Sequence, residues 1–269
     1  MTHMIYVVPS LKAKEKLQCE GKAWAESQGF TYVPRGKRTI QDLMDEYGED
    51  FLVYSSRGPQ IDRPEGSHFF SLNMAELRIQ NLRKGQRDHL LEALMGRGAS
   101  KLPITVLDCT CGFGADAAVA SFGLPTGSRV DALEVSPLLE AVTSLGFSHF
   151  VHKKDDVTAA LRRISLRHGD YRDYLLSDEG PVYDVLYFDP MFQRPVEASC
   201  QFQPVRAIME HGGLTRDLIE RALQKARRRV VIKERDFRQL CRDFPEVTLY
   251  GGKYSRIGYA VLECDSWKK

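Results

Sequence analysis

The sequence contains no apolar run near the roughly 20 residues that a membrane-spanning helix requires, and its first residues lack the apolar stretch of a secretory signal peptide. It also contains no internal repeat and no low-complexity segment. Hydrophobic residues make up 43% of the 269 residues and charged residues 28%, a balance that supplies a core and excludes a chiefly disordered chain. We expect a soluble, cytoplasmic protein without a membrane partner, with one core domain and a smaller appendage.

Cysteine is scarce and is not spaced for zinc. The six cysteines form no C-x-x-C pair, and no second cluster could complete a four-ligand site. Cys109 and Cys111 flank one residue inside an apolar segment, so we expect buried thiols rather than metal ligands or a disulfide. No spacing of histidines and carboxylates indicates a metal either, and none is expected.

Residues 1–66 alternate short apolar segments with amphipathic ones. The expected elements are strands at 4–8, 30–33 and 51–54, and helices at 11–28 and 39–47. Short uninterrupted apolar strands between helices favour a parallel sheet covered on both faces. Glycine and proline are frequent at 57–66, where we expect a boundary. This part is predicted to be a small α/β unit.

Residues 67–100 are predicted to be a basic helical connector, with the helix over 73–95. The net charge of the chain is only +2 (38 − 36), which neither requires nor excludes an acidic partner. Only local groups of basic residues can therefore indicate such a partner. RNA phosphates are one candidate partner, and an ordinary solvated helix face is the alternative explanation. The connector residues in question are Arg78, Arg83, Lys84 and Arg87, and a second basic group in the small unit is Arg35, Lys37 and Arg38.

Residues 101–269 show the clearest alternation of strands and helices. Strands are expected at 104–107, 129–133, 164–167, 183–188 and 230–232, helices from 115, 137, 155 and 215, and a hairpin at 247–262. This pattern predicts an α/β fold with a mostly parallel, doubly wound, Rossmann-like sheet and an antiparallel C-terminal hairpin. Ligands of such sheets bind beyond the carboxyl ends of the strands.

A glycine-rich loop follows the first of these strands. Gly112-Phe113-Gly114 opens a G-x-G-x-x-A pattern, which suits a nucleotide-binding turn but also occurs in purely structural loops. Glu134 ends the next strand about 20 residues later, where an acid can bind ribose hydroxyls. Asp108 lies just before the loop, where it would repel a pyrophosphate but favour a cationic group. The loop therefore favours S-adenosylmethionine over NAD.

The fourth strand ends at Asp189-Pro190-Met191-Phe192. Proline after an apolar run also stops a strand, which is the plain structural explanation. At the binding edge of the sheet, however, the Asp189 carboxylate and the Pro190 carbonyl supply two acceptors for an exocyclic NH2 group, and Phe192 offers a ring for stacking. This combination suits a planar base that carries an amine.

These segments together resemble a class I S-adenosylmethionine-dependent methyltransferase. The tetrapeptide at 189–192 resembles more specifically the RsmJ family, which methylates guanine N2 in small-subunit ribosomal RNA. The resemblance runs from about residue 67 to the C-terminus. It implies S-adenosyl-L-methionine as the cofactor, and small-subunit ribosomal RNA or the assembled small subunit as the partner.

The resemblance also implies site residues. The family's cofactor contacts fall on Ala115, Asp116, Glu134, Val135, Asp170, Tyr171 and Asp189, to which the loop pattern adds Asp108, Thr110, Gly112, Phe113 and Gly114. Asp189, Pro190 and Phe192 are the expected catalytic residues, and Lys233 joins the basic connector as a substrate-side candidate. The sequence departs from the family where Ala115 replaces an arginine, Val135 a basic residue, and Asp170-Tyr171 a serine pair.

Several functions stay open at the level of sequence. The G-x-G-x-x-A pattern and Glu134 are also compatible with an NAD-dependent dehydrogenase, although no catalytic His or Tyr-Lys pair accompanies them. A methyltransferase for DNA, protein or a small-molecule amine shares the same fold. A non-catalytic RNA-binding or assembly module is the remaining alternative.

Overall fold

The computed structural model describes residues 4–96, 102–190, 213–251 and 257–266. These residues form two compact units. The N-terminal unit comprises the chain up to Ser71 together with Ser136–His149, and the larger unit contains the remaining described residues. Our division into 1–66, 67–100 and 101–269 stays a prediction. No helix in the described part of the chain has both the length and the apolar character needed to cross a bilayer.

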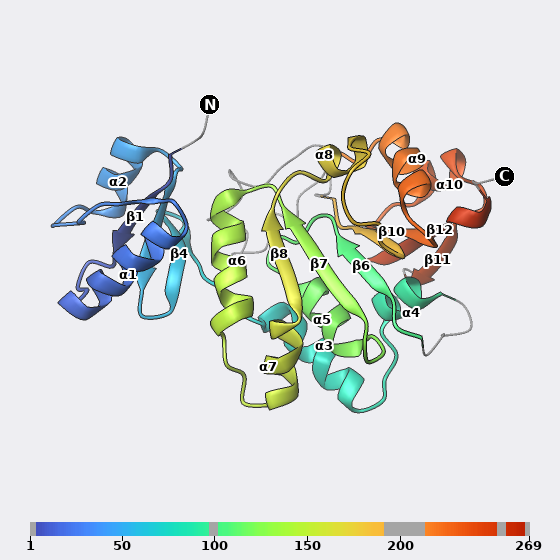
Figure 1. Cartoon of the computed structure of the whole chain (residues 1–269), viewed down its shortest axis with the longest axis horizontal. Coiled ribbons are helices and arrows are strands. Elements are labelled where there is room, and N and C mark those ends of the chain that lie inside the picture. Colours follow the sequence, from blue (N-terminus) through green and yellow to red (C-terminus); the bar gives the residue numbers. More distant parts are fainter. Residues whose placement is uncertain (1–3, 97–101, 191–212, 252–256, 267–269) are drawn as a thin grey trace. The chain divides into compact units, whose positions relative to one another are not determined.

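The N-terminal unit is built on a five-stranded sheet in the order β2-β1-β3-β4-β5 (Figure 1). Its elements are β1 (Tyr6–Pro9), α1 (Glu15–Ser27), β2 (Thr31–Tyr32), α2 (Ile40–Tyr47), β3 (Phe51–Ser55), β4 (Gly58–Arg63), β5 (Gly66–His68) and α6 (Pro137–His149). The first three strands are parallel, as predicted. Its core includes Val8, Leu43 and Phe51, all fully buried.

The segment 57–66 is not the simple boundary that we expected. Gly58 and Pro59 belong to β4 and Gly66 belongs to β5, whereas Pro64 lies in the turn between these strands. Ser55 pairs with Gly58 across a tight antiparallel turn between β3 and β4. Gly58 has a φ of 93°, a conformation that glycine adopts without strain. Pairing of β4 with β5 is also antiparallel, so the sheet of this unit is mixed rather than wholly parallel.

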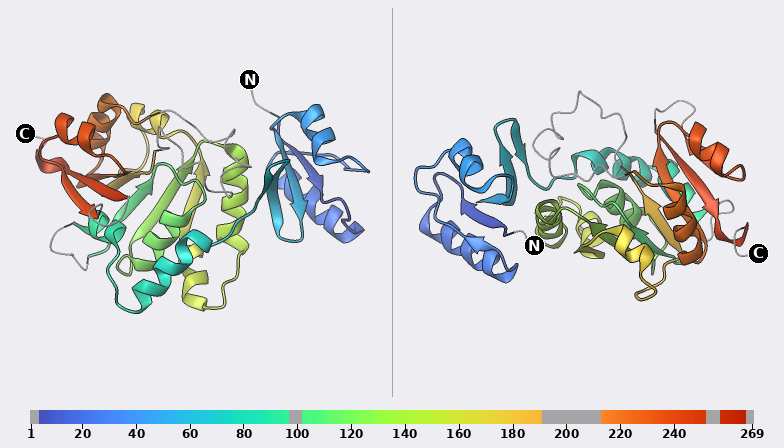
Figure 2. Two further views of the ribbon diagram at one scale, coloured as in Figure 1. Left: turned by 180° about the vertical axis from the view of Figure 1, so that it is seen from behind. Right: turned by 90° about the horizontal axis from the view of Figure 1, so that it is seen from above.

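The larger unit is built on a seven-stranded sheet in the order β11-β12-β10-β9-β6-β7-β8 (Figures 1 and 2). The strands are β6 (Thr105–Asp108), β7 (Arg129–Glu134), β8 (Ile164–His168), β9 (Val185–Phe188), β10 (Arg229–Glu234), β11 (Thr248–Gly251) and β12 (Gly258–Glu263). Strands β8, β7, β6, β9 and β10 are parallel, whereas β12 and β11 run antiparallel to their neighbours. This arrangement confirms the predicted fold class.

Helices cover this sheet. They are α3 (Asn73–Arg83), α4 (His89–Met95), α5 (Ala115–Gly123), α7 (Asp155–Arg162), α8 (Tyr171–Leu176), α9 (Arg216–Lys225) and α10 (Arg238–Asp243). The predicted helix at 73–95 is two helices, because Gly85 takes a φ of 75° after α3 and the Asp88 side chain caps α4 by accepting from the amides of Leu90 and Leu91. The sheet and α9 enclose a core that includes Leu186, Phe188 and Val230.

A methyltransferase site at the edge of the parallel sheet

The glycine loop joins β6 to α5 and bends over the end of β7. Gly112 and Gly114 have φ angles of 55° and 74°, in the left-handed region that glycine adopts readily. The Gly112 amide donates a 2.8 Å hydrogen bond to Oε2 of Glu134, the last residue of β7. The Cys111 amide likewise donates to the carbonyl of Leu133 at 2.9 Å. These contacts fix the loop and Glu134 as one assembly.

The same loop is tied to the end of β9. The Thr110 amide donates to Oδ1 of Asp108 at 3.1 Å, and the Thr110 hydroxyl accepts from the Asp189 amide at 2.7 Å. Asp108, Glu134 and Asp189 therefore lie at one edge of the sheet, held by a single loop, as the strand order required. Pro190 follows Asp189 and is half-buried, and Phe192 lies outside the described residues.

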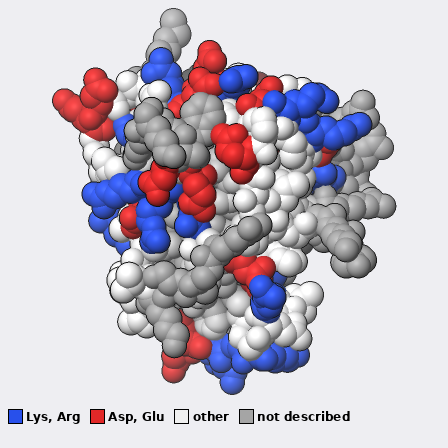
Figure 3. All heavy atoms as spheres, turned by 90° about the vertical axis from the view of Figure 1, so that its right-hand side faces the viewer, with Lys and Arg blue, Asp and Glu red and all other residues white. Residues whose placement is uncertain are grey.

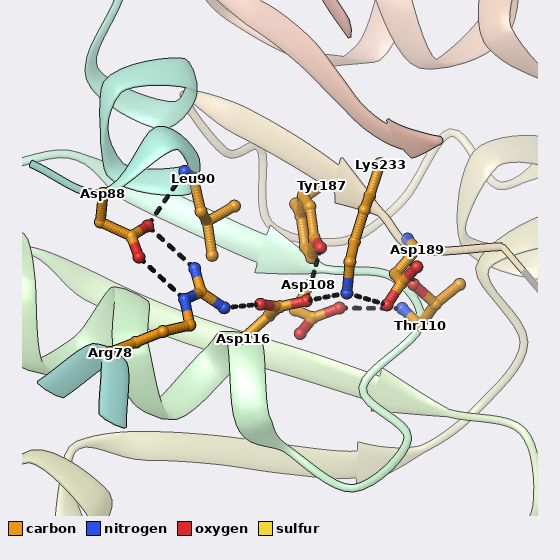
Figure 4. Close-up of polar contacts among 9 residues, drawn as sticks. All are labelled: Arg78, Asp88, Leu90, Asp108, Thr110, Asp116, Tyr187, Asp189 and Lys233. Atoms are coloured by element: carbon orange, nitrogen blue, oxygen red, sulfur yellow. Dashed lines mark hydrogen bonds and ion pairs between the residues drawn. The ribbon is translucent and has the colours of Figure 1, made fainter. Parts of the chain in front are cut away.

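A chain of charged side chains, Lys233, Asp116, Arg78 and Asp88, leads away from Asp189 (Figure 4). Lys233 on β10 donates to Oδ2 of Asp116 at 2.8 Å and to Oδ2 of Asp189 at 2.7 Å. Asp116, in the first turn of α5, also accepts from the Tyr187 hydroxyl at 2.8 Å and from Arg78. Arg78 on α3 forms two further bonds of 2.8 Å with Asp88. Four separate parts of the chain, α3, α5, β9 and β10, thus meet around the buried Asp116 and the half-buried Asp189.

Burial and neighbouring charges shift the pKa values of these acids in different directions. Burial raises the pKa of Asp108 well above its usual value, and Asp116 and Asp189 add to the effect. Burial also acts on Asp116, but Lys233 and Arg78 outweigh it and hold its pKa below the usual range. The pKa of Asp189 is raised to about 6, because burial and the charge of Asp116 exceed the lowering effect of Lys233.

The ends of β7 and β8 are joined beside the loop. The Gly169 amide donates to the carbonyl of Glu134 at 2.9 Å, and Nε2 of His168 lies 3.0 Å from the carbonyl oxygen of Val135. Asp170 caps α8 by accepting from the amide of Arg172 at 2.8 Å. Tyr171 is buried, with its ring edge-on to Phe188 at 5.4 Å between centroids. The predicted Asp170-Tyr171 pair therefore lies after β8, at the same edge of the sheet as the loop.

Residues 67–257 match the protein family described as "Putative SAM-dependent methyltransferase". The chain belongs to this family of methyltransferases. The protein therefore uses S-adenosylmethionine, and the NAD-dependent dehydrogenase considered from the glycine loop is set aside.

The chain is similar to several bacterial proteins. It is 29% identical over 229 residues to a Bacillus subtilis (strain 168) protein named Uncharacterized protein YpiP, covering 85% of this chain and 88% of that protein. It is 28% identical over 195 residues to Ribosomal RNA small subunit methyltransferase J of Dechloromonas aromatica, covering 71% and 76%. The corresponding Marinobacter nauticus protein is 28% identical over 194 residues, covering 71% of this chain and 66% of its own length.

A solved structure shares the fold over nearly the whole chain. The crystal structure of a SAM-dependent methyltransferase from Neisseria gonorrhoeae superposes with a TM-score of 0.61 and 18% sequence identity. The match covers 96% of this chain and 95% of the other. At this identity the likeness speaks for the fold alone.

The basic connector residues have different surroundings. Arg78 is largely buried, with its guanidinium bonded to Asp88 and Asp116, so its donors are engaged inside the larger unit. Arg83 forms an ion pair with Asp156, and Arg87 is exposed beside Glu92. Lys84 is exposed. On the face drawn in Figure 3, basic side chains form several groups, with acidic side chains close to some of them.

Sequence reasoning missed two partners in this site, Asp88 and the Tyr187 hydroxyl. Asp88 carried a local signal, since an aspartate before an apolar run is typical of a helix N-cap. Tyr187 had no such local signal, because a tyrosine in an apolar strand is usually a core residue. The link between Asp116 and Lys233 spans 117 residues of sequence, and only the fold reveals it.

Proposed function

We propose that the protein transfers the methyl group of S-adenosylmethionine to an exocyclic amine of a nucleobase, namely guanine N2 in small-subunit ribosomal RNA. The observation that supports the proposal is the hydrogen bond from the Asp189 amide to the Thr110 hydroxyl, which holds Asp189-Pro190 next to the glycine loop that we assign to the methyl donor. The two relatives named Ribosomal RNA small subunit methyltransferase J support the choice of RNA.

The residues at this edge fit the cofactor. Asp108 is 2% exposed, and its raised pKa reflects burial next to two other acids. A cationic amino acid group beside Asp108 would favour the ionised carboxylate, which is the opposite of what a pyrophosphate would do. Glu134, the amides of the loop and the Asp170-Tyr171 segment would hold the remainder of the cofactor.

The cofactor supplies a methyl group already activated by the positive charge on sulfur. The protein's main task is then to hold the amine in line with that group, and positioning of this kind contributes roughly 7–11 kcal/mol. We assign the Asp189 carboxylate and the Pro190 carbonyl to the two N–H groups of the amine. Both acceptors would also stabilise the positive charge that develops on nitrogen, and Asp189 or bulk water takes the released proton.

A base that lies in an RNA helix has to leave its stack to reach this edge, at a cost of a few kcal/mol. We assign stacking on the base to Phe192, and contacts with RNA phosphates to the exposed Lys84 and Arg87, with Arg83 able to exchange Asp156 for a phosphate. Arg78 and Lys233 are better explained as supports of the site, because carboxylates already occupy their donors.

The proposal is tested by nucleoside analysis of ribosomal RNA from cells that lack the gene. We expect loss of one N2-methylguanosine, restored by the wild-type gene and by Asp243→Asn, which alters an α10 carboxylate that accepts from Gln239. Asp189→Asn should not restore it, because an amide NH2 replaces an acceptor, at a cost of about 10²–10³ in rate. An unchanged nucleoside profile in the deletion strain would refute the proposal.

A further inference from the structure

Lys233 is held between two carboxylates that differ in their access to solvent. The side chains of Asp116 and Lys233 are 9% and 15% exposed, whereas that of Asp189 is 29% exposed. The three groups thus form a line from the interior to the site, with Asp189 at its open end (Figure 4). A buried ammonium in this line has to be paired, and both carboxylates pair with it.

The inner end of this line is fixed independently of any substrate. Asp116 is bonded by Arg78 and by the Tyr187 hydroxyl in addition to Lys233, and Arg78 is in turn held by Asp88. Lys233 itself follows Ile232, which pairs with Phe188 in the parallel register of β10 and β9. The position of the ammonium is therefore set by the sheet and by Asp116.

The bond from Lys233 engages Oδ2 of Asp189. The backbone amide of Asp189 is fixed separately by the Thr110 hydroxyl, so the main chain and one carboxylate oxygen are both held. Oδ1 is then the oxygen that can accept from an amine at the sheet edge. Rotation of the carboxyl group would break a charge-assisted hydrogen bond, the stronger class of hydrogen bond in proteins.

We infer that Lys233 is a positioning residue, which fixes the orientation of the Asp189 carboxylate and keeps it ionised so that it can accept from the substrate amine. This inference rests on the proposed function for the identity of the amine. It differs from the substrate contact expected from the sequence, because Lys233 acts here through Asp189 and not on RNA. The Asp116 carboxylate is engaged by Lys233, Arg78 and Tyr187. We therefore assign any contact of Asp116 with the cofactor to its main chain.

Without Lys233 the surroundings of Asp189 are mainly negative. Among the described residues, the titratable and charged groups that act on Asp189 include Lys233 and Glu234 on β10, Asp116 on α5, Asp108 on β6 and Tyr187 on β9. Of these named groups Lys233 carries the positive charge, and it lowers the Asp189 pKa. An opposite charge at this range shifts a carboxyl pKa by about 1–3 units, so its removal should raise the pKa of Asp189 from about 6 by that amount.

The test compares Lys233→Met with Lys233→Arg, which keeps the charge, and with Lys225→Met as a matched control. Lys225 is a half-buried lysine at the end of α9 that bonds the carbonyls of Tyr174 and Ser177, so its removal also takes away an anchored ammonium. The Asp189 carboxyl is followed by ¹³C NMR titration of carboxyl-labelled aspartates, assigned from the signal missing in Asp189→Asn. This readout requires neither cofactor nor RNA.

We expect the Asp189 pKa to rise by about 1–3 units in Lys233→Met, to return towards the wild-type value in Lys233→Arg, and to stay unchanged in Lys225→Met. In Lys233→Met the acid limb of the pH–rate profile for methylation should move to higher pH by the same amount, and activity should recover at alkaline pH. The KM for S-adenosylmethionine should change by less than about threefold. Should Lys233→Met fail to fold, Lys233→Gln provides the same comparison.

An unchanged or lowered Asp189 pKa in Lys233→Met would overturn the inference. A uniform loss of rate without displacement of the pH profile would also overturn it, because that result indicates a merely structural lysine. If the wild-type protein methylates no RNA, the proposed function fails, and the NMR titration still decides whether Lys233 controls the ionisation of Asp189.

Discussion

Replacement of Asp116 by asparagine provides a quantitative test of the buried charge network. Asp116 is 8% exposed and accepts hydrogen bonds from Arg78, Lys233 and Tyr187. Removing one partner of a buried ion pair costs about 3–5 kcal/mol, because it leaves an uncompensated charge. Arg78 keeps Asp88 and Lys233 keeps Asp189, so we expect the lower end, about 3 kcal/mol at pH 7.

The assay is urea unfolding of the variant and the wild type at pH 7, with Asp156→Asn as the control. Asp156 also pairs with an arginine, but its side chain is 54% exposed, and exposed pairs contribute about 0–1 kcal/mol. A loss of 3 kcal/mol in Asp116→Asn corresponds to about a 150-fold change in the folding equilibrium. Equal effects of the two substitutions would refute the view that the Asp116 network is a buried, cooperative part of the fold.

Three further predictions concern the cofactor, pH and packing. Asp108→Asn should weaken S-adenosylmethionine binding by roughly 10- to 100-fold, the value of one charge-assisted hydrogen bond, and an unchanged affinity by calorimetry would contradict the assigned role. Methylation by the wild type should rise with pH through about 6, because the Asp189 carboxyl must lose its proton to accept from the amine, and a flat rate between pH 5 and 8 would argue against this. Gly146→Ala should lower the free energy of unfolding by about 1–3 kcal/mol, because a Cβ at this position would lie 2.0 Å from the Phe70 ring. An unchanged melting temperature would contradict this close packing of Gly146 against Phe70.

The parts of the fold that sequence predicted well are those with local signals. Apolar strands alternating with amphipathic helices placed β6, β7, β9 and β10 within a few residues, and the parallel sheet followed from that alternation. Acids at the ends of three strands had to meet once the sheet was parallel, because carboxyl ends share one edge. Asp108, Glu134 and Asp189 were predicted in this way.

The parts that sequence did not predict depend on short elements or distant contacts. The helices α8 and α10 have six residues each, too short for a periodic apolar pattern. The glycines and prolines at 57–66 indicate a turn equally well whether that turn ends a unit or joins two strands. The sequence predicted Arg78 as a contact for RNA phosphates, because a basic helix residue has the same local pattern whether it faces a phosphate, solvent or the buried Asp116.

The central claim is that the methyl donor and an exocyclic amine meet beside Asp189. Its most direct test is incubation of the purified protein with isotope-labelled S-adenosylmethionine and small ribosomal subunits from the deletion strain, both assembled and as free RNA. The products are then digested to nucleosides and analysed by mass spectrometry. We predict label in N2-methylguanosine, whereas label on a ring nitrogen or on a ribose oxygen, or no labelled nucleoside, would contradict the account.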